Sequence, residues 1–380
     1  MRGEKKPQNL IFFSMDVEQM IPPSHPLRDI KRRTDSILRR MHADFQAAYA
    51  AGGRPSIPPE RLLGALLLKA FYSIPSDRKL EEAIRFNMLY RWFLDMTPDE
   101  PMWTAETFTK NRERFEKHEL FRKFFDAVVT EALLEKAAST DHFSVDGTLI
   151  RSWASAKSLE PAASSDIDDK NDDDPPSDPG NPWVDFRGER RTNDTHRSRT
   201  DPQARLMKKG RGKEAHLSHM GHFLMENRNG LLMDVYTTEA NGHAEREAAR
   251  KMLSRVRIRH LLMPKTLGAD SGYDAGPFLR ELWTIHRTVP HIPVRRGAIR
   301  GNGVYTEARR RARRRMTQVG YAASQRIRKR IEEAIGWAKT VAGLARTKLV
   351  GRWKLGQELY IAATAWNLLR LTKITAAAAA

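Results

Sequence analysis

The chain has 380 residues, enough for a substantial core and two domains, and its net charge of +19 favours a nucleic acid as partner. The absence of cysteine excludes disulfides, thiolate zinc sites and cysteine nucleophiles. No apolar run reaches the ~18 residues of a membrane span, so we expect a cytoplasmic protein with no membrane partner.

Residues 1–137 are predicted to be helical. Two prolines open the apolar stretch 60–71, which we expect to form a buried helix. Residues 78–95 are predicted as a second helix, and residues 104–119 as a third with a basic outer face. Three short helices of this kind fit either a helix-turn-helix-like DNA reader or a plain bundle with a solvated face, and the pattern does not decide between them.

From about residue 141 the pattern changes to mixed strands and helices. The predicted strands cover 142–145, 215–226, 231–237, 265–269 and 289–294, and the predicted helices cover 245–257 and 274–286. Asn229-Gly230 predicts a hairpin with a type I′ turn, because both residues tolerate positive φ. This order is typical of an α+β protein with an RNase H-like mixed sheet.

An insertion follows the first of these strands, at residues 157–213, and is predicted to be mostly irregular. Its half 160–178 has eight acidic residues against one lysine, and its half 187–213 has ten basic residues against three acidic ones. Neither half has enough apolar surface to fold alone. We therefore interpret the acidic half as disordered, and the basic half as a segment that could order on DNA.

Asp146 and Asp270 each close a predicted strand, and Glu332 lies in a predicted helix. Parallel neighbouring strands bring their carboxyl ends to one edge of a sheet, where two carboxylates can share metal ions. Oxygen ligands of this kind suit hard divalent cations. Two such ions can activate one oxygen and stabilise another during attack on a phosphodiester. The sequence therefore predicts two Mg²⁺ or Mn²⁺ ions held by these three acids.

The glutamate belongs to the pattern Arg328-x3-Glu332-x6-Lys339, in a stretch predicted as one helix over 324–345. Residues four and seven apart share a helix face, so the two cations flank the acid and can contact phosphates. Its neighbour Glu333 is the rival, shifted in phase by roughly 100°. On its own, the spacing also fits a simple surface ion pair.

Several other residues are candidates for DNA contacts. The arginine-rich run 309–315 is hard to explain by packing, and we interpret it as a set of phosphate contacts that includes Arg309, Arg310, Arg311 and Arg313. Trp153 and Trp337 fit either base stacking or core packing, and we favour the core for Trp337. We expect Asp274 to cap the helix that follows it.

Three histidines also call for interpretation. His216, His219 and His222 have the spacing of a helical metal face, but they fall in a predicted strand, where residues three apart point to opposite faces. We therefore expect ordinary strand histidines near DNA and no zinc site.

The motifs around the three acids resemble those of the bacterial insertion-sequence DDE transposases of the family-five type. The motifs are Asp146-Gly147-Thr148-Leu149-Ile150, Gly268-Ala269-Asp270-Ser271-Gly272-Tyr273-Asp274 and the stretch 328–340. Segments 87–93 and 107–112 are similar to that family's leader domain. One departure is Gln325, which stands where the family's signature has a tyrosine, so a contact made by that tyrosine is in doubt.

The resemblance implies two domains: a helical DNA-binding leader domain at 1–137 and an RNase H-like catalytic domain at 138–375. It implies that Asp146, Asp270 and Glu332 are the catalytic triad, and that Arg328 and Lys339 contact the DNA ends. The implied enzyme binds terminal inverted repeats, frees 3′-hydroxyls and transfers them to target DNA, as a homodimer or larger assembly near the nucleoid. Two alternatives stay open: a nuclease of the same fold, and an inactive, domesticated DNA-binding protein.

Overall fold

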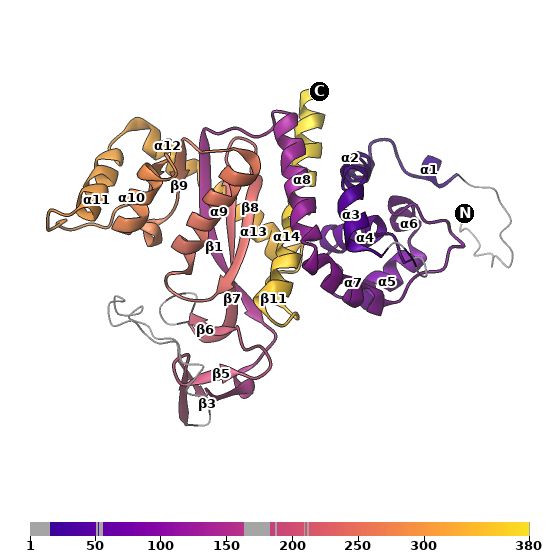
Figure 1. The fold of residues 1–380 in the computed structure, drawn as a ribbon, viewed down its shortest axis with the longest axis horizontal. Coiled ribbons are helices and arrows are strands. Elements are labelled where there is room, and N and C mark those ends of the chain that lie inside the picture. The colour runs from indigo at the N-terminus through magenta and orange to yellow at the C-terminus, as the bar shows by residue number, and fades with distance from the viewer. Residues whose placement is uncertain are drawn as a thin grey trace, which may run out of the picture.

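The chain is described here from a computed structural model. The structure describes residues 16–50, 52, 56–162, 183–186, 188–208, 210 and 213–379. A helical region forms one end of the molecule, a mixed sheet its middle and helices α10–α12 the other end, while a group of short strands extends below the sheet (Figure 1). This is the predicted α+β class, with a helical region followed by an RNase H-like sheet.

The N-terminal region is helical, as predicted. Its helices are α1 (Val17–Met20), α2 (Pro26–Arg40), α3 (His42–Ala48), α4 (Pro59–Phe71), α5 (Asp77–Phe86), α6 (Met88–Phe93), α7 (Ala105–Lys117) and α8 (Leu120–Leu134). The prediction of one helix over 78–95 is wrong. Asn87 has an extended backbone, and its side chain accepts hydrogen bonds from the amides of Leu89 and Tyr90, so it caps α6 and separates it from α5.

Seven strands form the central sheet. They are β1 (His142–Ser152), β6 (Arg205–Lys208), β7 (Ala215–Glu226), β8 (Leu231–Glu239), β9 (Thr266–Gly268), β10 (Val289–His291) and β11 (Arg346–Thr347). The order is β10-β9-β1-β7-β6, with β8 also on β7 and β11 on β1. β9 lies parallel to both β1 and β10, whereas β7 is antiparallel to β1 and β8.

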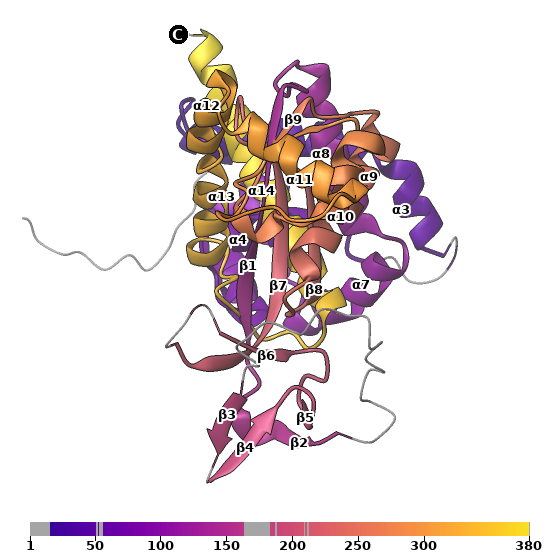
Figure 2. The ribbon, with the colours of Figure 1, turned by 90° about the vertical axis from the view of Figure 1, so that its left-hand side faces the viewer.

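Helices cover both faces of this sheet (Figure 2). Neighbouring strand residues point to opposite faces, which shows which helix lies on which side. Tyr236 of β8 lies under the guanidinium of Arg255 from α9 (Ala244–His260), 4.6 Å from the ring centroid. The next residue, Thr237, donates a hydrogen bond to the carbonyl of Arg352 at the start of α14 (Arg352–Ala379). Hence α9 covers one face, and α14 covers the other.

The turn between β7 and β8 differs from its prediction. A hairpin is present, but Gly230 is the turn residue with positive φ, at 72°, and Asn229 has none. The amide of Gly230 donates to the carbonyl of Glu226 at 3.0 Å, which closes a four-residue loop. The prediction of a type I′ turn is therefore wrong, because four residues separate the two strands, whereas a type I′ hairpin turn has two.

The insertion is only partly as predicted. The acidic residues 163–182 lie outside the described part of the chain. The basic half forms β3 (Trp183–Phe186), β4 (Glu189–Thr192), β5 (His196–Ser198) and β6, with β5 paired to β2 (Leu159–Pro161). The prediction of an irregular segment that orders on DNA is therefore wrong for these residues. Pairing of β6 with β7 and of β5 with β2 gives their backbones hydrogen bonds, and the weakly hydrophobic sequence did not indicate this pairing.

One buried carboxylate attaches this insertion to the core. Asp201 accepts hydrogen bonds from Ser152 at 2.7 Å and from the amide of Gly351 at 3.2 Å, and it contacts the His219 ring at 2.8 Å. Asp201 is 1% exposed. The Asp201 side chain thus joins the insertion to the end of β1 and to the residue before the start of α14.

A network of partly buried charges joins the helical region to α14, which packs on the central sheet. Glu358 of α14 lies 3.1 Å from Lys69 of α4 and 3.3 Å from Arg112 of α7, and both cations also contact Asp77. Burial opposes the ionisation of Glu358, but Lys69 and Arg112 keep its pKa below the ordinary value. The helical region is therefore fixed on the C-terminal helix.

Replacing Glu358 by Gln tests this attachment. The substitution leaves two partly buried cations with one carboxylate, and we expect it to lower the free energy of unfolding at pH 7 by about 3 kcal/mol. A lowered carboxyl pKa contributes stability above its unfolded value of 4.5, and that contribution is lost as pH falls. The matched control is Glu82→Gln, whose exposed pair with Lys79 should contribute little. Equal unfolding curves for both variants would contradict the assignment.

Candidate active site

Asp146 lies in the middle of β1, not at a strand end. The prediction that the strand stops at Asp146 is wrong, because β1 pairs with β7 over its length and continues to Ser152. Its other neighbour, β9, reaches only as far as Ser144. Asp146 therefore emerges where one edge of β1 has just lost its partner. The amide of Gly147 donates to its Oδ1 at 2.8 Å and fixes the carboxylate.

Asp270 follows β9 by two residues, as predicted, on the strand parallel to β1. Its Oδ1 accepts the amide of Gly272 at 2.8 Å and caps the short helix η3 (Ser271–Tyr273). Because β9 is parallel to β1 and ends early, this turn lies beside Asp146. A backbone amide therefore holds each aspartate in place.

Glu332 does not lie on the sheet with the two aspartates but on the helix α13 (Arg330–Thr340). The prediction of one helix over 324–345 is wrong: α12 (Val319–Ile327) and α13 are separated by a turn at Arg328 and Lys329. The amide of Glu332 bonds to the carbonyl of Lys329, three residues back, so the turn is tightened and the chain continues in the same direction.

Electrostatics connects the three acids. Burial, together with the charges of Asp270 and Glu332, raises the pKa of Asp146 to about 6, although the Gly147 amide and Arg328 act to lower it. A carboxyl group titrates this high only where counter-charge is scarce. The structure thus brings the three predicted acids into one electrostatic unit, with Arg328 beside them.

Glu245, at the start of α9, is a fourth acid at this site, and the sequence analysis did not assign it a role. Burial raises its pKa to about 7, and the charges of Asp270 and Asp146 contribute to the shift. Its position after the β7–β8 hairpin could have indicated Glu245, because the first turn of the helix that follows lies near the edge of β1. The sequence spacing between Glu245 and the other acids gave no indication.

The donor set fits divalent cations by its chemistry. It consists of carboxylate oxygens, carries excess negative charge and lies in a partly buried site, which hard cations prefer. Among the described residues, the completely buried hydroxyl of Tyr273 has no hydrogen-bond partner, and the charges of Glu245, Asp146 and Asp270 act on it. Within the described ranges, no three His, Cys, Asp or Glu side chains are placed to hold one ion together.

A basic groove lies further along the elements that carry Asp146 and Glu332. Its volume is about 690 Å³, and its lining includes Arg151 of β1, Lys213, Lys339 of α13 and Arg346. On β1, Arg151 follows Asp146 toward the end of the strand, and on α13, Lys339 follows Glu332 toward the end of the helix. The groove lies roughly 10 Å beyond Glu332, two helical turns along α13. The predicted contact Lys339 therefore lines a surface that suits a phosphate backbone.

Trp153 lies beside this groove. Its side chain is 54% exposed, and the guanidinium of Arg346 stacks 4.1 Å from its ring centroid. Trp337, in contrast, packs against the core, 5.8 Å from Trp366. The preference for the core is confirmed for Trp337, and Trp153 is the exposed aromatic ring.

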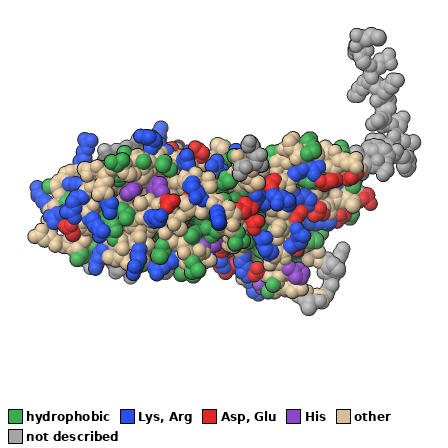
Figure 3. Space-filling model, turned by 90° about the horizontal axis from the view of Figure 1, so that it is seen from above, with side chains coloured by type: hydrophobic (Ala, Val, Ile, Leu, Met, Phe, Trp, Pro, Cys, Tyr) green, Lys and Arg blue, Asp and Glu red, His purple; other side chains and the backbone are tan. Residues whose placement is uncertain are grey.

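The predicted arginines lie on α11 (Val304–Arg315), and several have partners within the protein. Arg309 pairs with Asp274, while Arg310 and Arg313 donate to backbone carbonyls of the loop before α11. Arg311 is exposed and lies 4.6 Å from the ring centroid of Trp283. Blue side chains cover this end of the molecule, and red ones gather toward the helical region (Figure 3).

Two smaller predictions need correction. Asp274 does not cap α10 (Gly276–Thr284), whose N-cap is Ala275; its carboxylate accepts bonds from Arg309 and from the amide of Arg295. The strand histidines His219 and His222 are fully buried and contact Asp201 and Thr238, respectively, so their surroundings are protein interior.

Gln325, at the family's tyrosine position, has contacts of its own. Its side-chain amide donates to the carbonyls of His291 and Ala269, and so joins α12 to the ends of β10 and β9.

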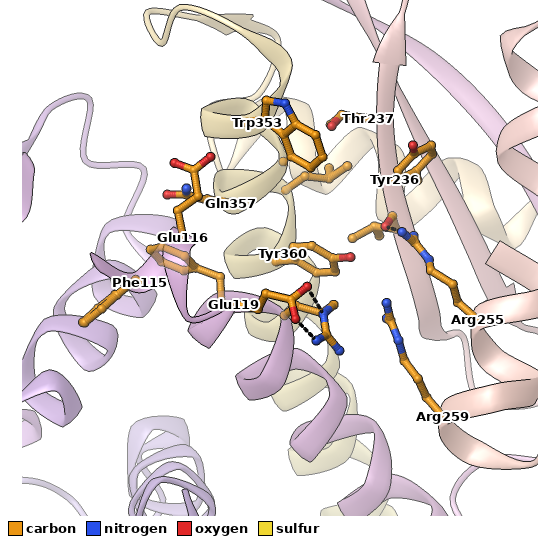
Figure 4. Close-up of a pocket in the computed structure, with 15 residues that line it drawn as sticks. Phe115, Glu116, Glu119, Tyr236, Thr237, Arg255, Arg259, Trp353, Gln357 and Tyr360 are labelled. Atoms are coloured by element: carbon orange, nitrogen blue, oxygen red, sulfur yellow. Dashed lines mark hydrogen bonds and ion pairs between the residues drawn. The ribbon is translucent and has the colours of Figure 1, made fainter. Parts of the chain in front are cut away.

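A separate cavity of about 170 Å³ lies between the helical region, β8 and α14 (Figure 4). Tyr236, Arg255, Arg259 and Trp353 point into it, and none of the four acids lines it. Both polar atoms of the Gln357 amide are buried there without a hydrogen-bond partner. This cavity belongs to the seam between the two regions and lies apart from the acids.

Comparison with known proteins gives two matches. Residues 15–114 match a family described as Transposase domain (DUF772), and residues 186–368 match one described as Transposase DDE domain. The second match contains Glu245, Asp270 and Glu332 but begins after Asp146. No curated protein and no solved structure matches the chain.

None of the helices in the described residues has the length and hydrophobicity of a membrane span.

The raised pKa of Asp146 predicts how pH affects the cation-free protein. A carboxyl whose folded pKa is above its unfolded 3.8 binds more protons in the folded state, so it lowers stability as pH rises through about 4 to 6. We expect Asp146→Asn to raise the free energy of unfolding at pH 7.5 by about 3 kcal/mol, from two pKa units. The gain should shrink at pH 5. The exposed Asp141→Asn is the control, and a wild-type unfolding midpoint for Asp146→Asn at pH 7.5 in EDTA would contradict the prediction.

Proposed function

The chain belongs to the insertion-sequence DDE transposases, and from this premise we propose that it cuts and rejoins DNA at the ends of its element. In this proposal the protein binds terminal inverted repeats, cleaves to free 3′-hydroxyls and transfers them to target DNA. The family-five type stays a prediction, because the two family matches do not test it. The observation that carries the proposal is the electrostatic unit of Asp146, Asp270 and Glu332.

The acids divide the chemical work by their surroundings. Asp146 and Asp270 are each fixed by one backbone amide, so they would hold divalent cations at the edge of β1. Glu332, on a separate helix, would complete the ligand set from the other side. Such cations, when bound, would activate the attacking oxygen and stabilise the leaving oxygen of the phosphodiester. Arg328, the cation that acts on Asp146, is placed to contact a phosphate at the same centre.

DNA would approach along the basic groove. Lys339 and Arg151 line this groove on the elements that also carry Glu332 and Asp146, and Arg346 lines it from β11. A DNA strand lying in the groove would therefore lead to the centre. The exposed ring of Trp153 could stack on a base at the groove's far end. The α11 end, with Arg311 exposed, would contact a second stretch of phosphates. Pairing of two ends requires at least a dimer on DNA.

Substitution of each acid tests the chemistry. Asp146→Asn, Asp270→Asn and Glu332→Gln each remove a ligand charge without opening a cavity. We expect each to abolish cleavage and strand transfer on labelled terminal-repeat DNA while binding changes little. Glu333→Gln, on the neighbouring exposed position, is the control and should stay active.

The outcomes of this test separate the alternatives. Strand transfer by any of the three variants would remove that residue from the site. Cleavage without joining by the wild-type protein would favour a nuclease. Absence of both activities in the wild-type protein, with end binding intact, would favour an inactive DNA-binding protein.

The α11 contacts are tested by salt dependence. If Arg311 contacts a phosphate, Arg311→Gln should weaken binding to all sequences and flatten the slope of log K against log salt by about 0.9. Arg311 is suited to this test because it is exposed, whereas Arg309→Gln would also break the pair with Asp274. The control is Arg40→Gln, on an exposed pair of the helical region. A wild-type slope for Arg311→Gln would place this helix away from DNA.

A further inference from the structure

The start of α9 is bonded to the turn that carries Asp270. Asn241, two residues before the N-cap residue His243, accepts hydrogen bonds from the amides of His243 and Ala244 at 2.9 and 2.7 Å. Arg246 donates to the carbonyl of Gly272 at 3.0 Å and contacts the His243 ring. These bonds fix the first turn of α9 against the catalytic edge of the sheet, with Glu245 between them.

Two glycines leave room for the Glu245 carboxylate. A Cβ atom at Gly147 would lie 3.0 Å from Oε1 of Glu245, and a Cβ atom at Gly272 would lie 3.4 Å from its Oε2. The same point at Gly272 is 3.0 Å from Oδ1 of Asp270. One oxygen of Glu245 therefore lies against the residue after Asp146, and the other lies beside the Asp270 carboxylate.

No donor in the described part of the chain makes a hydrogen bond to this carboxylate, although Glu245 is partly buried. The adjacent guanidinium of Arg246 bonds to Gly272 and His243 instead. The Tyr273 hydroxyl, fully buried and without a partner, is acted on by Glu245 together with both aspartates. In the described part of the chain, a buried hydroxyl without a partner that is acted on by three carboxylates indicates a missing ligand at this place.

We propose that Glu245 is a fourth carboxylate ligand of the catalytic centre, and that it holds a divalent cation on the α9 side of the two aspartates. Glu332 reaches the aspartates from α13 and Glu245 from α9, on the two faces of the sheet. Each glutamate then serves one ion, and Asp146 and Asp270 lie between the two. The assignment of a catalytic role rests on the proposed function, but cation binding itself does not require DNA or activity.

The test measures Mn²⁺ binding to the full chain without DNA, by calorimetry and by the paramagnetic signal of free Mn²⁺. We expect Glu245→Gln to weaken one class of site by at least about tenfold. Glu332→Gln should weaken the other class, so that the double variant loses both. The matched control is Glu247→Gln, an exposed acid two residues further along α9.

Unchanged Mn²⁺ affinity and stoichiometry in Glu245→Gln would overturn the proposal, as would an equal loss in Glu247→Gln. Thermal unfolding in EDTA reports on folding, and Glu245→Gln should unfold no earlier than the wild-type protein because it relieves like-charge repulsion. If that variant does not fold, Glu245→Asp keeps the charge and withdraws it by one methylene, and it should give an intermediate loss. If the acid variants lose Mn²⁺ affinity but still cleave DNA, the proposed function is wrong and the cation site is still supported.

Discussion

Repulsion between carboxylates that lie close together and partly out of water is the constraint on which the rest of this structure depends. Burial, together with the charges of nearby carboxylates, raises the pKa of Asp146 to about 6 and that of Glu245 to about 7. Such a cluster costs folding free energy unless cations enter it. The fold bears this cost through strand pairing on β1 and through backbone amides that hold each aspartate.

The positive charges of the chain are arranged accordingly. Arg328 acts on Asp146 and Arg246 acts on Glu245, while the cations of the groove and of α11 lie further along β1 and α13 or out on α11. More arginines beside the acids would neutralise them and compete with metal ions for them. Cations at a distance leave the centre free for divalent ions and still attract the phosphates that surround a scissile bond.

The C-terminal helix gives the helical region a fixed place relative to this centre. Thr372 of α14 donates to Asp29 at 2.9 Å, and Glu358 contacts two cations of the helical region. Arg112 belongs to that buried network, and Arg114 stacks on Tyr49, so the basic outer face expected for α7 is smaller than its sequence suggests. Any DNA bound by the helical region would therefore reach the basic groove in a fixed orientation.

Sequence patterns predicted what depends on local chemistry. The strand 215–226 matches β7 residue for residue, and Asp270 lies just past β9 as expected. What failed depends on partners distant in the chain. β1 continues past Asp146 because β7 pairs with it, and the basic insertion forms strands because β7 and β2 accept them. Glu245 had no spacing to reveal it, since only the fold brings α9 to this edge.

The same distant pairing explains why Asp274 does not cap a helix. Its carboxylate, fully enclosed, accepts two bonds from Arg309 of α11 and one from the amide of Arg295. Asp274 ends the turn that begins with Asp270, so the arginine-rich helix is attached to the same turn that presents a catalytic acid. A phosphate drawn to Arg309 would compete with Asp274 for the guanidinium and loosen that attachment. Because Arg311 makes no ion pair with the residues that the structure describes, a phosphate on Arg311 would leave the turn fixed. Arg309 and Arg311 are therefore not equivalent, although they belong to one run.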